Sequence, residues 1–236
     1  MTFIRGKLTS LVWLGMVPLM SLSLVACSST TSSQSTDSGS SNSQMAQMDH
    51  GSMGHGQASP MPMDHGSMSM DLGPADENFD LLFIDGMIPH HEGAVIMAQE
   101  ALQKSNRPEI KQLAQAIIDA QEQEISELKG WRSAWYPNVG DEPMMYHAEM
   151  GHMMPMTEEM RSSMMMSGDL GAADGEFDLR FINAMIPHHQ GAIDMAQQAL
   201  EKSDRPEIKE LAQTIISSQQ AEIDQMTQWR KDWYGQ

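Results

Sequence analysis

The chain has 236 residues, with 32 Asp and Glu against 14 Lys and Arg, 25 methionines, nine histidines and one cysteine. Its formal net charge of −18 argues against nucleic acid as a partner, because phosphate groups would be repelled. One cysteine allows neither an intramolecular disulfide nor a site of several thiolates, so stability must come from an apolar core or a bound metal.

The first predicted element is an export signal over residues 1–26. Arg5 and Lys7 precede an apolar stretch over residues 11–25, and small residues follow, which is typical of a signal peptide and not of a membrane span. The sequence Leu-Val-Ala-Cys, ending at Cys27, resembles the lipobox of bacterial lipoproteins, which implies lipid attachment to the Cys27 thiol. We therefore expect an exported protein, periplasmic or in the cell envelope and anchored to a membrane by lipid. Ordinary secretion is the alternative.

Residues 27–78 are predicted to form a disordered tether. Its first part is Ser-, Thr- and Gln-rich and cannot bury enough apolar surface to offset the entropy of ordering. Its second part contains seven methionines and a Met-x-His-x-x-Met cassette that occurs twice. A glycine-rich segment without helical or strand periodicity gives these methionines no core to fill, so metal binding is the better explanation. The candidate ligands are Met48, His50, Met53, Met63, His65 and Met68.

An internal duplication dominates the rest of the chain. Residues 79–136 align without a gap to residues 177–234, and about six positions in ten are identical. Each unit contains the sequence Met-Ile-Pro-His-His, at residues 87–91 and 185–189.

Each unit is predicted to form two amphipathic helices. In the first helix, apolar residues recur at helical spacing from Phe79, Pro89 interrupts the pattern, and the helix should end near Ser105. Asn106 with Glu109, and the equivalent Asp204 with Glu207, match an N-terminal capping pattern for the second helix. Pro108 and Pro206 then fall in its first turn.

The predicted fold is all-α, a ferritin-like four-helix bundle over residues 79–236. One helical hairpin buries a single face, whereas two hairpins related by a pseudo-twofold axis close one core. The connection over residues 137–176 carries ten methionines, and residues 157–166 are predicted to form a short helix within it. The candidate ligands in this connection are His147, Met150, His152 and Met153.

Polar residues interrupt the apolar stripes in the middle of each unit. His90 and His91 lie on or beside the buried face of the first helix, and Gln121 and Glu124 replace apolar residues in the second. One interpretation is a satisfied polar layer in which His90 bonds Glu124 and His188 bonds Glu222. The other is a metal site, because methionines flank the same His-His pair in both units.

The pattern Phe-Asp-x-x-Phe-Ile-x-x-Met-Ile-Pro-His-His-x-Gly-Ala-x-x-Met-Ala resembles an exported bacterial family first classed as a domain of unknown function. The better understood branch of that family is the CopM-like copper-binding proteins of cyanobacteria. The resemblance implies a ferritin-like bundle that binds Cu(I) through methionine and histidine. Carried onto this chain, it points to Met87, His90, His91, Met97, Met185, His188, His189 and Met195.

The function predicted from the sequence is extracytoplasmic copper binding without catalysis. The protein would sequester Cu(I) or pass it to a copper exporter or another metal acceptor, and so contribute to copper resistance. Cu(II) could also bind, and Ag(I) should compete. A di-iron site is disfavoured because the duplicated helices lack Glu-x-x-His. The remaining alternatives are a cuprous oxidase and a structural envelope lipoprotein.

Overall fold

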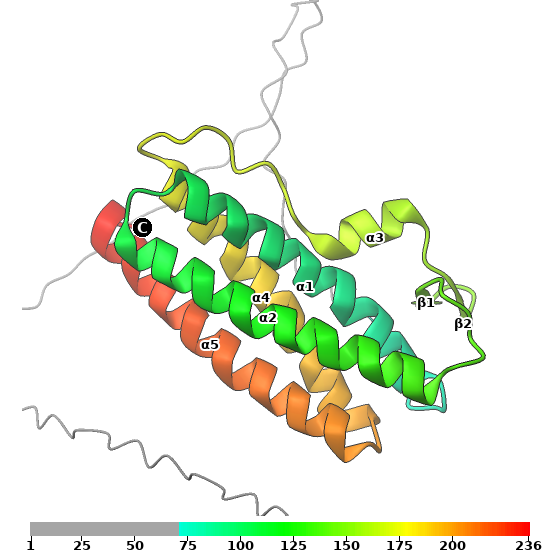
Figure 1. The fold of residues 1–236 in the computed structure, drawn as a ribbon. Helices are drawn as coiled ribbons and strands as arrows, with labels where there is room; N and C mark the ends of the chain where they lie inside the picture. The colour runs from blue at the N-terminus through cyan, green and yellow to red at the C-terminus, as the bar shows by residue number, and fades with distance from the viewer. Residues whose placement is uncertain (1–70) are drawn as a thin grey trace, which may run out of the picture. The chain divides into compact units, whose positions relative to one another are not determined.

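The computed structural model describes residues 71–236, which contain five helices and one short hairpin of strands (Figure 1). The signal peptide, Cys27 and both Met-x-His-x-x-Met cassettes lie outside the described residues. The elements are α1 (Phe79–Lys104), α2 (Pro108–Trp135), β1 (Met144–His147), β2 (His152–Pro155), α3 (Glu158–Met165), α4 (Phe177–Lys202) and α5 (Pro206–Tyr234).

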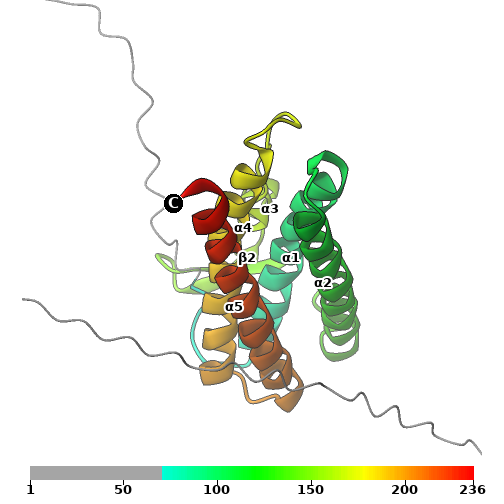
Figure 2. The same ribbon diagram turned by 90° about the vertical axis from the view of Figure 1, so that its left-hand side faces the viewer.

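Two helical hairpins form the bundle, as the sequence predicts. Helix α1 packs against α2, α4 packs against α5, and the hairpins meet through α1 and α4. Figure 2 shows the α1/α2 pair beside the α4/α5 pair. Among residues 71–236, no helix combines the length and apolar composition needed to cross a lipid bilayer.

The helix boundaries follow from local sequence, with one correction. Helices α1 and α4 continue through Pro89 and Pro187, and α2 and α5 begin at a proline, whose fixed φ suits a first helical residue. The predicted Asn106/Glu109 cap, like its Asp204/Glu207 equivalent, is wrong, because the proline start places an arginine at the N-cap. The Ser105 hydroxyl instead accepts a hydrogen bond from the Arg107 N–H at 3.1 Å.

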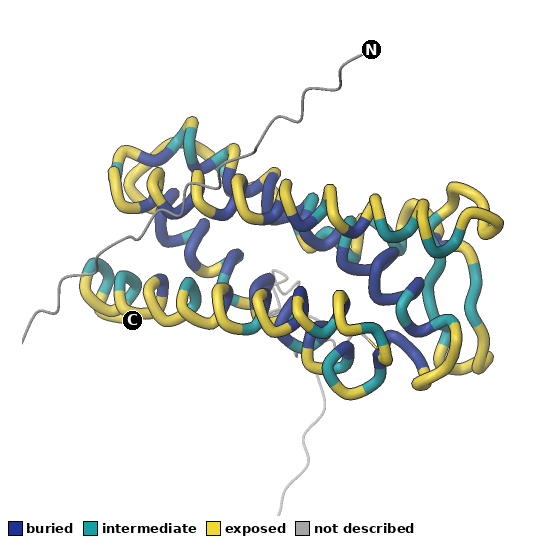
Figure 3. The backbone as a smooth tube through the Cα atoms, turned by 60° about the horizontal axis from the view of Figure 1, so that its bottom comes forward, coloured by how far each residue is buried: buried dark blue, intermediate teal, exposed yellow. Residues whose placement is uncertain are grey.

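Two apolar clusters fill the bundle, one on each side of its middle. One contains Phe177 and Phe181 with the second half of α1 and the first half of α2. The other contains Phe79 and Phe83 with the second half of α4 and the first half of α5. Each cluster combines the start of one unit's first helix with the middle of the other unit, and the two clusters are built from equivalent residues. This is the predicted pseudo-twofold arrangement. Figure 3 shows the buried residues gathered on the facing sides of the helices.

Residues at the end of the predicted tether pack against α4. Leu72 is 4% exposed within the second cluster, and its N–H donates to Gln198 Oε1 at 3.2 Å. Lys202 donates to the Gly73 carbonyl at 2.7 Å. The folded unit therefore includes residues before Phe79.

The connection between the units docks on α1. Its strands β1 and β2 pair antiparallel, and the sequence did not predict them. The predicted short helix is confirmed as α3.

Asp85 and Glu92 on α1 hold the connection in place. Asp85 accepts hydrogen bonds from Arg132 and from the Met144 N–H. Burial raises the pKa of Asp85, although Arg132 opposes the shift. Glu92 on α1 accepts from Arg161 of α3. Position 85 is Asn183 in the second unit, where the connection does not dock.

Gly93 allows α3 to approach α1 closely. A Cβ at this position would lie 1.8 Å from the Met165 carbonyl oxygen, which is backbone and cannot rotate away. Only glycine therefore fits under the end of α3.

We predict that Gly93→Ala lowers the free energy of unfolding by about 1–3 kcal/mol, the usual cost of overpacking. Gly130→Ala is the matched control, since no atom of the described chain lies within 4 Å of its Cβ position and alanine favours helix. The control should be neutral or stabilising by up to about 1 kcal/mol. Urea unfolding followed by circular dichroism measures both, and equal effects would contradict the close docking of α3.

Candidate metal centre

Four histidines form a buried layer between the two apolar clusters. His90, His91, His188 and His189 are each at most 1% exposed. The His90 and His188 ring centroids lie 3.9 Å apart, so the two units meet through these imidazoles where α1 packs on α4. In each unit, the neighbouring histidine ring lies slightly more than 6 Å away.

In each unit the glutamate contacts the second histidine of the His-His pair, whereas the sequence predicted a bond to the first. Glu124 Oε2 lies 2.7 Å from His91 Nε2, and Glu222 Oε2 lies 2.7 Å from His189 Nε2. The expected bonds from Glu124 to His90 and from Glu222 to His188 are wrong. Consecutive helical residues point about 100° apart, so one histidine faces its own hairpin partner while the other faces the opposite unit.

These contacts fix which nitrogen of each ring carries a proton. A carboxylate or a carbonyl oxygen only accepts, so Nε2 is the donor in His189 and also in His188, which bonds the Met165 carbonyl at 3.1 Å. The short contact with Glu124 favours a proton on Nε2 of His91 as well. Nδ1 of each of these rings then has a free lone pair. Histidines that bind metals almost always donate their other N–H to such a group.

Several buried polar atoms in the layer have no hydrogen-bond partner among residues 71–236. They include both ring nitrogens of His90 and of His91, and Nδ1 of His188 and His189. Leaving such a group unsatisfied costs about 1–3 kcal/mol. The concentration of six such nitrogens in one layer is better explained by a ligand than by structural polarity alone.

The two central histidines, His90 and His188, are neutral at physiological pH. Burial, followed by repulsion from the other imidazoles, holds the pKa of His90 well below its usual 6.5. Burial and repulsion from His189 and His91 lower the pKa of His188 to about 3, against the opposing effect of hydrogen bonds to the backbone of Met165 and His90. Proton competition for the lone pairs of these two rings is therefore weak.

Four fully buried methionines flank the histidines, and they pair across the units. Met87 and Met195 belong to one apolar cluster, and Met97 and Met185 belong to the other. Each side of the layer thus receives one thioether from each unit. The sequence predicted that the methionines of one unit act together, and it did not predict that they pair with methionines of the other unit.

A second group of candidate ligands lies at the turn of the strand hairpin. His147 and His152 are cross-strand partners, and Met150 between them is 55% exposed. His152 Nδ1 donates to the Met150 carbonyl at 3.2 Å, which leaves its Nε2 lone pair free. Met153 pairs with Tyr146 in the adjacent register position. The structure therefore brings these predicted residues together, apart from the buried layer.

No group of three or more His, Cys, Asp or Glu side chains in residues 71–236 is placed to hold a metal ion. The candidate donors in the buried layer are imidazoles and methionine sulfurs. That donor set is soft and suits Cu(I) better than iron or manganese.

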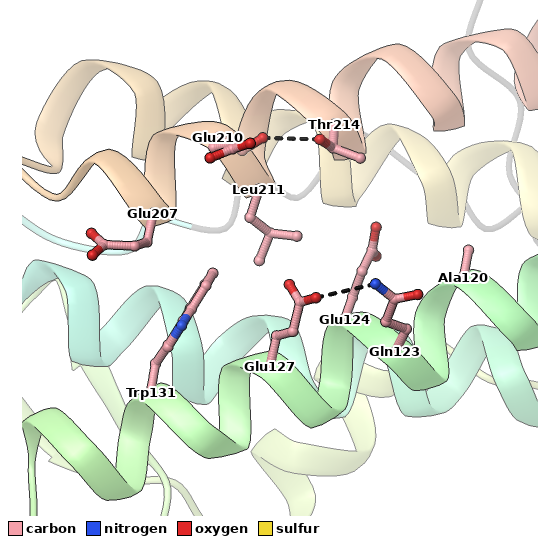
Figure 4. A pocket seen from close by; sticks show the side chains of 9 residues that line it. All are labelled: Ala120, Gln123, Glu124, Glu127, Trp131, Glu207, Glu210, Leu211 and Thr214. Atoms are coloured by element: carbon pink, nitrogen blue, oxygen red, sulfur yellow. Dashed lines mark hydrogen bonds between the residues drawn. The ribbon is translucent and has the colours of Figure 1, made fainter. Parts of the chain in front are cut away.

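An acidic groove of about 470 Å³ runs between α2 and α5 (Figure 4). Glu124, Glu127, Glu207 and Glu210 line it together with Trp131. Because Glu124 also contacts His91, the groove reaches the edge of the histidine layer. Sequence reasoning missed the groove, although the helical spacing of these glutamates on each helix was a signal.

The fold and the layer define an all-α protein of two duplicated hairpins around a buried centre of histidine and methionine. The chain belongs to the family described as Domain of unknown function (DUF305), whose model matches residues 26–132 and 80–230.

Solved structures of the family share this fold. CopM in its Cu(II)-bound form is 43% identical, with a TM-score of 0.53, over 66% of this chain and 97% of CopM. CopM in its Cu(I)-bound form is 41% identical, with a TM-score of 0.51. A DUF305 protein from Streptomyces coelicolor is 27% identical, with a TM-score of 0.51, over 64% of this chain and 90% of its own.

A further relative is the uncharacterized protein L153 of Acanthamoeba polyphaga mimivirus, which is 47% identical over 49 residues. This match spans 21% of the chain and 32% of the viral protein.

We predict that the metal-free protein loses stability as pH falls from about 6.5 toward 3. The unfolded chain takes up protons at the ordinary histidine pKa of 6.5, whereas folded His188 resists protonation down to about 3. Each such histidine contributes a slope of up to about 1.4 kcal/mol per pH unit. The double variant His90→Gln/His188→Gln should show a shallower slope in urea unfolding between about pH 6.5 and 5. An unchanged slope would mean that these rings titrate normally.

Proposed function

We propose that the protein binds Cu(I) as cargo in the buried layer, outside the cytoplasm, and sequesters it or passes it to a metal acceptor. The observation that carries this proposal is the set of unpaired Nδ1 atoms on His91, His188 and His189, each in a ring whose Nε2 lies within 3.1 Å of a carboxylate or carbonyl oxygen. Such pre-oriented lone pairs are typical of metal ligands.

The surroundings of the layer favour Cu(I) over Cu(II). The neutral imidazoles of His90 and His188 and the thioethers bring no negative charge, and apolar clusters lie on both sides. Since the cost of burying an ion rises steeply with its charge, a singly charged soft cation fits this environment best. Ag(I) shares both properties and should compete. Cu(II) fits the partly exposed His147 and the exposed His152 at the hairpin turn better, because water can complete its coordination there.

The route for copper follows from where the ligands occur. The two Met-x-His-x-x-Met cassettes and the hairpin turn would capture copper, and the layer would then receive it by ligand exchange. The four glutamates of the groove, one of which is Glu124, create a negative field that attracts cations toward the layer. A copper exporter or another metal acceptor would take the ion onward, and the outcome for the cell would be copper resistance.

The relatives support the same function. CopM has been solved with Cu(I), Cu(II) and Ag bound, and it shares about two fifths of its residues with this chain over almost its whole length. The Streptomyces relative is assigned to the secreted proteins, in keeping with a signal peptide over residues 1–26. The proposed lipid anchor at Cys27 would hold the copper site at a membrane.

We predict that replacing His90, His91, His188 and His189 by glutamine removes the strongest Cu(I) binding and the rise in melting temperature that Cu(I) causes, because only the native state binds the ion. As a purely structural change, each substitution should cost about 1 kcal/mol. A Cu(I) titration against a chromophoric chelator and a thermal melt measure the two effects.

The control is His147→Gln/His152→Gln, which should keep the strongest site and lose only a surface one. If the fourfold variant binds Cu(I) as tightly as the parent, the layer is not the site. If it unfolds, Met87, Met97, Met185 and Met195 are replaced singly by leucine, which keeps volume and apolarity but removes the sulfur.

We also predict that Cys27→Ser releases the protein from membranes without changing copper binding, because the thiol serves only as the lipid anchor. Cell fractionation of the parent and the variant measures the first effect, and Cu(I) titration measures the second. A parent protein whose mature N-terminus is not Cys27 would contradict the anchor and leave the copper proposal standing.

A further inference from the structure

Helix α3 places one more methionine against the Met87/Met195 side of the layer. A Cβ on Gly86 would lie 3.8 Å from Met164 Cε and 3.9 Å from Met195 Sδ. The ends of the Met164 and Met195 side chains therefore both lie against Gly86 of α1. Met87 follows Gly86 in sequence and is fully buried.

These three methionines share one apolar cluster. Met87 and Met195 are buried members of it, and Met164 is half-buried and packs against it. They come from three different helices, α1, α3 and α4, so the chain gathers the sulfurs only when it folds. The opposite cluster contains Met97, Met185 and Met226 of α5, and none of its members comes from α3.

The two units differ at the positions that receive α3. Gly86 is replaced by Ala184 in the second unit, and Glu92, which bonds Arg161 of α3, is replaced by Gln190. The ion pair between Glu92 and Arg161 that holds α3 is thus available in the first unit alone.

We infer that Met87, Met164 and Met195 form a three-thioether site for Cu(I) or Ag(I), beside the imidazoles and on the side of the layer that α3 covers. This inference rests on the proposed function. Three neutral thioethers in an apolar cluster match a soft, singly charged ion and exclude Cu(II) and Zn²⁺, which prefer nitrogen or charged ligands.

The same helix connects this site to the imidazoles. The Met165 carbonyl, one residue after Met164, accepts the Nε2–H of His188 and so keeps Nδ1 of that ring free. Docking of α3 thus supplies one sulfur ligand and orients one nitrogen ligand.

The test is Met164→Leu in the full chain, which keeps the apolar volume and removes the sulfur. In a Cu(I) titration against a chromophoric chelator, the variant should lose one bound equivalent or bind it at least about tenfold more weakly, the scale on which changes around a metal act. Met87→Leu and Met195→Leu should behave alike. Met160→Leu, on the same helix but outside the apolar clusters, is the matched control and should match the parent.

The outcomes separate this inference from the proposed function. If the parent binds no Cu(I), the proposed function fails. If the parent binds Cu(I) and Met164→Leu binds it equally in number and affinity, the three-thioether site is wrong and the proposed function stands. Loss in Met160→Leu as well as Met164→Leu would indicate a general effect of α3 packing and would also overturn the site.

A measurement on the parent protein avoids any effect of the substitution on folding. In NMR spectra of protein labelled with ¹³C at the methionine methyl groups, Ag(I) should shift the Met87, Met164 and Met195 signals together at one stoichiometric point. The single leucine variants assign the three signals. A Met164 signal that stays in place while Met87 and Met195 move would overturn the site.

Discussion

The contact between His90 and His188 is the constraint on which the rest of the bundle depends. It lies where α1 packs on α4, with an apolar cluster on each side, so both rings are removed from water. A charged imidazole there would be costly, and the low pKa of both rings keeps them neutral. Neutral rings with unpaired nitrogens are poor structural groups but good ligands. The outer contacts to Glu124, Glu222 and the Met165 carbonyl then make sense as supports that hold each ring in one tautomer.

Duplication gives the bundle its symmetry, and the connection between the units breaks it. Residues 137–176 dock mainly on α1, where Asp85 and Glu92 accept hydrogen bonds from them, although His188 of the second unit also bonds the Met165 carbonyl. The residues equivalent to Asp85 and Glu92 are Asn183 and Gln190, which lack the charges for that docking. A symmetric scaffold thereby acquires a covered side, beneath α3. An acidic groove lies elsewhere, between α2 and α5.

Much of the fold could be predicted because its signals are local. Two helical hairpins and the approximate ends of their helices were predicted and are confirmed. The signals were the apolar periodicity, the prolines at positions 108 and 206, and the gapless repeat. The helix caps were wrong by one residue, since the arginine before each proline takes the N-cap. The strand pair was missed because four-residue strands rich in methionine carry little periodic signal.

The sequence by itself determined the kinds of ligand, their duplication and the helices that carry them, because residue type and helical spacing depend on neighbours along the chain. Only the tertiary structure decided which histidine each glutamate bonds, that the methionines pair across the units, and that Met164 lies beside Met195. Those relations depend on the rotation of each helix about its axis and on the docking of a segment about 80 residues from Gly86. Spacing along one helix contains no information about either.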